Sequence, residues 1–181
     1  MKRRTFLSAA ATLFPAAAFP AATLQATPPT PDQGHIIPAG HDRLDEKHSL
    51  GFSQILFKVL PSETANGLFV AEHQNLVKGG PPLHVHLYQE EWFYVMEGEV
   101  DFQVGDKRFR LGPGDSAFGP RGVPHTFSHV GATPGRMLIA FTPAGKMEQF
   151  FRTVAIPNGP GMTPEIFASC DMKYIGPSPF A

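Results

Sequence analysis

Residues 81–100, PPLHVHLYQEEWFYVMEGEV, place two histidines and two glutamates directly before an apolar, aromatic run. His84 and His86 lie one residue apart, so on a β-strand both side chains point to the same face. Burying two adjacent imidazoles is unfavourable unless they are hydrogen-bonded or bind a metal. The pair therefore predicts either a solvent-exposed strand or an inward-facing metal site, and the rest of the chain has to decide between them.

The composition favours an all-β fold. The 181 residues include 19 prolines and 18 glycines, which suits many short strands joined by turns. Val100, Phe102 and Val104 alternate with polar residues up to the turn sequence Gly105-Asp106, after which the alternation resumes. This pattern predicts a two-residue hairpin with one buried face.

Two helices are expected after the strands. Apolar residues over 146–155 recur with helical spacing, at Met147, Phe150, Phe151 and Val154. Thr163 is a good N-cap before Pro164, and Gly176 suits the position past the end of a helix that carries Ile166, Cys170 and Tyr174 on one face. We expect both helices to pack on the β-domain, with Cys170 as a small core residue.

The N-terminal residues 1–26 have the layout of an export signal: a basic start, an apolar stretch and small residues. Arg3 and Arg4 followed by Thr-Phe-Leu resemble a twin-arginine signal. A basic disordered tail or an uncleaved membrane anchor are the alternatives. An export signal predicts a bacterial periplasmic or secreted protein. The resemblance to twin-arginine signals implies that the protein folds before export, as proteins that load a cofactor often do.

The remaining chain divides into a Pro-rich linker or arm (27–48), a β-domain (49–145) and a helical C-terminal segment (146–181). His35, His41 and His48 lie in the arm, where we expect them to be solvated. Without residues 1–26 the chain keeps 12 basic and 16 acidic residues, a net charge of −4. This balance argues against nucleic-acid binding, and no membrane association is expected after signal removal. The single Cys170 excludes an intramolecular disulfide.

Residues 80–98 resemble the first motif of the cupin family: His-x-His, a spacer, glutamate, six residues and glycine. The spacing from His86 selects Glu91 over Glu90 as the motif carboxylate. The leading glycine is displaced, because Gly79 and Gly80 lie closer to His84 than in the family pattern.

Residues 114–129 resemble the second cupin motif, through Gly114, Pro120, Gly122 and His125. The family's asparagine is His129 here. The two motifs occur in the right order, joined by the expected hairpin. The resemblance, closest to small single-domain quercetin dioxygenase-like cupins, implies a jelly-roll β-barrel.

The resemblance implies a metal site made of His84, His86, Glu91 and His125. Glu91 lies an odd number of residues from His86, so a turn or bulge near 87–89 must redirect it inward. Three imidazoles and a carboxylate leave open positions on an octahedral ion and suit one divalent Fe, Mn, Ni, Co or Cu, with Zn as an alternative. Next to these ligands, Glu90 is a candidate base, although a solvated position at the rim suits it better. His129 is a candidate for orienting a ligand or lining the mouth of the pocket.

Three functions are compatible with such a site. The first is a metal-dependent dioxygenase acting on a small aromatic or enolic substrate, with Glu91 as ligand and proton acceptor. The second is a non-catalytic periplasmic module that binds a small ligand or metal. The third is a metal-assisted isomerase, epimerase or decarboxylase. The sequence favours the first, because the ligand set is intact, the expected lining is apolar, and no basic cluster for a phosphorylated sugar is found apart from Arg121 beside the second motif. A homodimer is compatible with the family resemblance.

Overall fold

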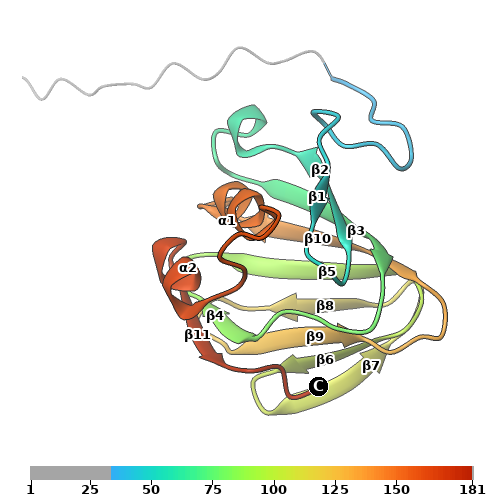
Figure 1. Cartoon of the computed structure of the whole chain (residues 1–181), viewed down its shortest axis with the longest axis vertical. Coiled ribbons are helices and arrows are strands. Elements are labelled where there is room, and N and C mark those ends of the chain that lie inside the picture. Colours follow the sequence, from blue (N-terminus) through green and yellow to red (C-terminus); the bar gives the residue numbers. More distant parts are fainter. Residues whose placement is uncertain (1–33, 181) are drawn as a thin grey trace, which may run out of the picture. The chain divides into compact units, whose positions relative to one another are not determined.

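The computed structural model of the protein describes residues 34–180, so the expected export signal and the first part of the arm lie outside it. Within this range the protein is a two-sheet antiparallel β-structure, as the composition predicts (Figure 1). The larger sheet has the order β1-β2-β3-β10-β5-β8. Its strands are β1 (His48–Ser49), β2 (Gln54–Val59), β3 (Phe69–Leu76), β10 (Gly135–Thr142), β5 (Glu90–Glu97) and β8 (Ser116–Gly119).

The second sheet has the order β11-β4-β9-β6-β7. Its strands are β11 (Met172–Gly176), β4 (Leu83–His86), β9 (His125–His129), β6 (Val100–Val104) and β7 (Lys107–Leu111). The predicted hairpin is confirmed: Val104 pairs with Lys107 across Gly105, whose φ of +57° lies in the left-handed region. A short 3-10 helix, η1 (Pro61–Glu63), follows β2.

The inward faces of the two sheets meet in an aromatic core. Phe93 of β5 packs against Phe102 of β6, with ring centroids 5.0 Å apart, and against Phe127 of β9 at 5.9 Å. Phe69 and Phe141 extend this core along β3 and β10. Edge-to-face and stacked contacts of this kind stabilise the core beyond simple area burial, and they fix the strands that carry the site.

The chain crosses from one sheet to the other between β4 and β5. Residues 87–89 form the bend, with Leu87 and Tyr88 exposed at its tip. The odd spacing between His86 and Glu91 predicts a turn here that redirects Glu91 inward. The turn is present, because the chain passes from one sheet to the other at these residues.

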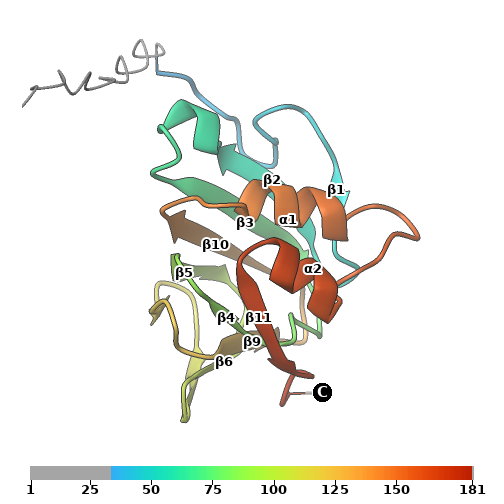
Figure 2. The ribbon, with the colours of Figure 1, turned by 90° about the vertical axis from the view of Figure 1, so that its left-hand side faces the viewer.

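The two C-terminal helices lie side by side on one flank of the barrel (Figures 1 and 2). Helix α1 (Met147–Val154) has the predicted extent and buries the predicted face. Helix α2 (Pro164–Ser169) begins as predicted, with the Thr163 hydroxyl accepting a hydrogen bond from the Ile166 amide.

The predicted end of the second helix at Gly176 is wrong. Helix α2 stops at Ser169, because Asp171 takes a left-handed conformation with φ of +59°. Residues 172–176 instead form β11, which pairs with the histidine-bearing strand β4. Tyr174 is therefore a strand residue, whereas Cys170 is buried, as expected. The 146–181 segment is thus partly helical and partly an edge strand of the barrel.

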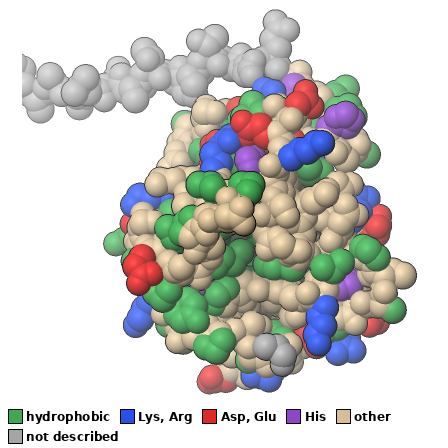
Figure 3. All heavy atoms as spheres, in the orientation of Figure 1, with side chains coloured by type: hydrophobic (Ala, Val, Ile, Leu, Met, Phe, Trp, Pro, Cys, Tyr) green, Lys and Arg blue, Asp and Glu red, His purple; other side chains and the backbone are tan. Residues whose placement is uncertain are grey.

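The aromatic run of β5 is split between two faces. Phe93 is buried, whereas Trp92 is 40% exposed and stacks on Tyr94 with ring centroids 5.7 Å apart. Because alternate strand residues face opposite sides, Trp92 and Tyr94 lie on the face of β5 that points away from the core. On the face shown in Figure 3, basic and acidic side chains are interspersed. Among the described residues, no helix is both long and apolar enough to cross a membrane.

Candidate metal centre

The structure brings His84, His86, Glu91 and His125 together. Strand β4 supplies the first two, β5 supplies Glu91, and β9 supplies His125. His84 pairs directly with His125 across the β4–β9 ladder. All four side chains are buried, and one nitrogen or oxygen atom from each lies within 4.8 Å of the others.

Three short contacts define this cluster, which we call the His3Glu cluster. His125 Nε2 lies 2.8 Å from Glu91 Oε2, and His86 Nε2 lies 3.2 Å from the same oxygen. His84 Nε2 lies 3.2 Å from His86 Nε2. Four polar atoms from three strands thus converge on one small volume inside the barrel.

Backbone carbonyls fix the orientation of two of the rings. His84 Nδ1 donates to the carbonyl of Pro82 at 2.8 Å, and His125 Nδ1 donates to the carbonyl of Val123 at 2.9 Å. Because a carbonyl only accepts, each Nδ1 carries the proton, and the neutral ring presents the lone pair of Nε2 to the cluster. Outer hydrogen bonds of this type are typical of metal-binding histidines. His86 differs, since its Nδ1 has no partner among the described residues.

The electrostatics of the His3Glu cluster favour a bound cation. Burial, together with the neighbouring His125 and His86, lowers the pKa of His84 to about 3. Burial alone would raise the pKa of Glu91, but hydrogen bonds to His125 and His86 outweigh it and place this pKa far below the ordinary range. Burial would likewise lower the pKa of His125, yet the bond to Glu91 raises it. Without a cation, the site therefore needs a proton between His125 and Glu91.

The donor set and its spacing fit a metal ion. Metal–ligand bonds of about 2.1 Å at right angles place neighbouring ligand atoms about 3 Å apart. The three measured contacts, 2.8, 3.2 and 3.2 Å, are close to that value. Three neutral imidazoles and one carboxylate suit a divalent transition metal and leave positions free on an octahedral ion.

An apolar cavity of about 30 Å³ lies against the His3Glu cluster. Its wall includes His84, His86 and Glu91, and most of the rest comes from aromatic and sulfur-containing side chains of both sheets and both helical segments. These are Phe52, Phe127, Phe141, Phe150, Phe151, Phe167, Met147, Met162 and Met172. The helices that the sequence predicts on the barrel therefore form part of the cavity wall.

One polar residue of this wall, His73, lies outside both sequence motifs. His73 of β3 is buried and lines the same cavity. No motif marks it, but Phe69 and Ala71, which alternate with it on the strand, are core residues. The parity of that strand could therefore have predicted an inward-facing histidine.

Glu90 and His129 both lie outside the His3Glu cluster. Glu90 forms a two-pronged ion pair with Arg121, including a 2.6 Å bond, and its neighbour Glu91 takes the inward face. His129 is buried, yet the atoms around it belong to Gly98, Gly131 and Gly135. Four residues of strand span about 13 Å, so sharing a face with His125 does not bring His129 to the site.

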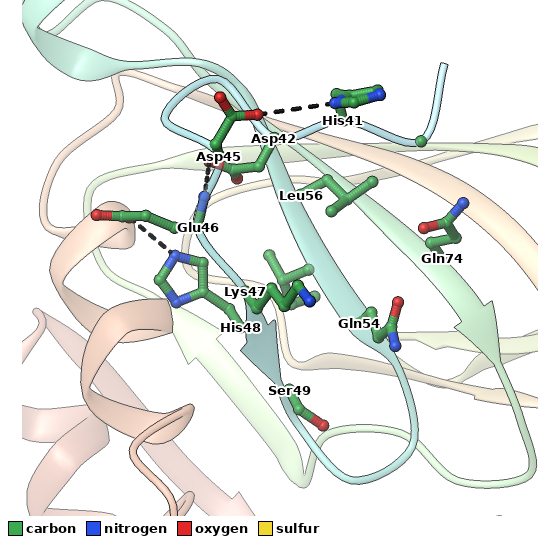
Figure 4. A pocket seen from close by; sticks show the side chains of 12 residues that line it. His41, Asp42, Asp45, Glu46, Lys47, His48, Ser49, Gln54, Leu56 and Gln74 are labelled. Carbon is green, nitrogen blue, oxygen red and sulfur yellow. Dashed lines mark hydrogen bonds and ion pairs between the residues drawn. The ribbon is translucent and has the colours of Figure 1, made fainter. Parts of the chain in front are cut away.

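The arm histidines are likewise separate from the His3Glu cluster. A larger hollow of about 410 Å³ lies beside β1 and β2, lined mainly by polar residues (Figure 4). There His41 lies 3.7 Å from Asp45, and His48 lies 3.1 Å from Glu46. His41 is exposed, as expected, whereas the His48 side chain is only 11% exposed and its ring stacks on Phe57 with centroids 4.5 Å apart, so the expectation of a solvated side chain is wrong for His48.

Fold and site together define a jelly-roll barrel with a potential metal centre in its lumen. Residues 73–141 match the family described as "Cupin domain". The chain is 21% identical to an RmlC-like cupin from Shewanella frigidimarina, with a TM-score of 0.53 over 66% of this chain and 99% of that one. The described part of this protein therefore has the cupin jelly-roll fold, and residues 73–141 resemble a cupin domain.

Two further proteins are similar to a smaller share of this chain. An uncharacterized protein from Methanocaldococcus jannaschii is 26% identical over 102 residues, which are 48% of this chain and 82% of that protein. The polyketide cyclase RemF from Streptomyces resistomycificus is 25% identical, with a TM-score of 0.45 over 51% of this chain and 66% of that one.

Proposed function

We propose that the His3Glu cluster binds one divalent transition metal and that the loaded protein is a dioxygenase-like enzyme acting on a compact enolic or aromatic substrate. The observation that carries this proposal is the convergence of four buried donor atoms, with metal-ligand spacing, on a cavity walled by phenylalanine and methionine. A bound metal of this class would supply Lewis-acid and redox chemistry at the positions left open by the protein.

The residues of the chain have separate roles in this proposal. His84 and His125 present Nε2 lone pairs that the backbone has already oriented. Glu91 is an anion at neutral pH, and its Oε2 faces the imidazoles. Its Oε1 makes none of the hydrogen bonds found among the described residues, so this second oxygen is the atom to accept a substrate proton. The apolar wall excludes water from the reacting groups.

The lining favours oxygen chemistry over sugar-phosphate chemistry. Dioxygen is apolar and partitions readily into a cavity walled by aromatic rings. A phosphorylated sugar needs cationic partners, and the described residues that line the cavity include no lysine or arginine. Arg121, the basic residue beside the second motif, is already paired with Glu90.

The small volume of the cavity limits the size of the substrate. Pockets for drug-sized ligands measure roughly 300–1,000 Å³, whereas this cavity measures about 30 Å³. A flavonol-sized molecule enters only if side chains such as Phe150, Phe151 or Phe167 move. The same observation favours a second candidate, a non-catalytic module that holds a metal together with a very small ligand.

Residues 1–26 support a proposal on the cellular location of the protein. We infer export by a twin-arginine-type route to the periplasm or beyond, which places metal loading in the cytoplasm before export. The partner of the site is a small molecule, and a homodimer is proposed as the assembly.

The test is oxygen uptake by metal-loaded protein, measured with an oxygen electrode against a panel of small enols and catechols. Wild-type protein should consume oxygen with at least one of them, and Glu91→Gln should retain part of its metal but lose turnover. Metal binding without uptake across the panel, in wild-type protein, would replace the dioxygenase-like enzyme with the binding module.

A further inference from the structure

His73 has an unusual environment for a core residue. It pairs with Ile55 of β2 and Met137 of β10 in the middle of the larger sheet, and its side chain is 2% exposed. Nδ1 lies 2.8 Å from the hydroxyl of Ser53. Nε2 is buried and has no hydrogen-bond partner among the described residues.

Aromatic rings hold the imidazole in place. The ring centroid of Phe127 lies 5.5 Å away at 90°, and Phe52 and Phe151 lie at 6.1 and 6.2 Å. With Ser53 fixing one edge of the ring, Nε2 cannot turn toward another polar group without breaking these contacts. Its orientation is therefore set by the fold.

An unpaired polar atom in this position has a cost. Burying a donor or acceptor without a partner is unfavourable by about 1–3 kcal/mol. Burial also lowers the pKa of His73 to about 4, so the ring is neutral at neutral pH and its Nε2 acts as an uncharged hydrogen-bonding atom. A phenylalanine would fill the same space without this cost, which indicates that Nε2 has a partner when the site is in use.

The cavity shows where that partner lies. His73, His84, His86 and Glu91 all line the same space of about 30 Å³, and the other described lining residues are apolar. That volume accepts about two water-sized molecules. An occupant of two or three heavy atoms can thus contact the His3Glu cluster at one end and His73 at the other.

We propose that His73 Nε2 is the hydrogen-bond partner of a small exogenous ligand, of the size of dioxygen or azide, bound at the metal centre, and that Ser53 positions the ring. This inference rests on the proposed metal site and deepens it. His73 selects for short ligands with a polar far end, while the phenylalanine wall excludes longer ones.

The experiment uses the full chain loaded with Co²⁺ and titrated with azide, followed by visible absorption of the cobalt centre. Metal content is measured in parallel on every variant. His73→Phe removes the hydrogen bond but keeps an aromatic ring, and His73→Gln restores a polar group. The matched control is His129→Phe, the same substitution at a buried histidine whose ring nitrogens are also unpaired and which does not line the cavity.

We expect His73→Phe to keep its cobalt and to bind azide about three- to tenfold more weakly, the effect of one hydrogen bond. His73→Gln should recover part of the affinity, Ser53→Ala should lose a smaller part, and His129→Phe should match wild type. The inference is overturned if His73→Phe binds azide like wild type. Should His73→Phe not fold, the inference is overturned if Ser53→Ala and His73→Gln both bind azide like wild type.

Two other outcomes separate this inference from the proposed function. Loss of cobalt in His73→Phe would overturn the role as ligand partner and make His73 part of the metal coordination. Failure of wild-type protein to bind cobalt at all would overturn the proposed metal site itself.

Discussion

Replacing His73 with phenylalanine should remove part of the acid sensitivity of the metal-free protein. Burial holds the pKa of His73 at about 4 in the folded state, whereas the unfolded chain has a histidine pKa of about 6.5. As the pH falls through this window, the unfolded chain takes up a proton that the folded protein resists. The stability that neutral His73 contributes is therefore complete above the unfolded pKa and is lost as the pH falls toward 4.

The magnitude follows from the two pKa values. At about 1.4 kcal/mol for each pH unit between them, wild-type protein should lose about 3 kcal/mol relative to the variant between pH 7 and pH 4. His84, whose pKa burial also lowers, titrates in both proteins and cancels in the difference.

Urea denaturation of both metal-free proteins at several pH values from about 7 to about 4 measures this difference. The free energy of unfolding of the variant should fall less steeply than that of wild type. Parallel curves would refute the reasoning, because they would mean that His73 is protonated as easily in the folded protein as in the unfolded chain.

Three further changes test other parts of the structure. A Cβ on Gly119 would lie 3.1 Å from Nδ1 of His125, so Gly119→Ala should weaken cobalt binding, whereas Gly112→Ala, with open space around it, should not. Phe167→Ala should lower the free energy of unfolding, measured by urea denaturation, by about 3–5 kcal/mol and admit imidazole to the cobalt centre. Unchanged imidazole binding would mean that Phe167 does not restrict access to the cavity. Glu90→Gln should leave metal content and unfolding unchanged, since its carboxylate is paired at the surface; loss of metal would show that the wrong glutamate was chosen.

The parts of the site that depend on local spacing could be predicted from the sequence. Strand parity places His84 and His86 on one face, and motif spacing distinguishes Glu91 from Glu90, which the structure separates into an inward and an outward side chain. The hairpin around Gly105 follows from turn chemistry in the same way.

The parts that depend on long-range pairing could not be predicted in this way. Residues 172–176 look helical locally, and only pairing with β4 makes them a strand. His129 shares the strand of His125, but distance along the strand removes it from the site. His73 carries no motif, and its importance appears only when β3, β4 and β5 are brought around one cavity.

The central claim is that His84, His86, Glu91 and His125 hold a metal. The most direct test is elemental analysis of protein purified from the exported fraction without added metal, for wild type, His84→Ala, His86→Ala, His125→Ala and the control His129→Phe. The account predicts about one transition-metal ion per chain in wild type and in the control, and almost none in the three alanine variants. Stoichiometric metal in all three alanine variants, or a folded wild-type protein that neither carries nor takes up metal, would contradict it.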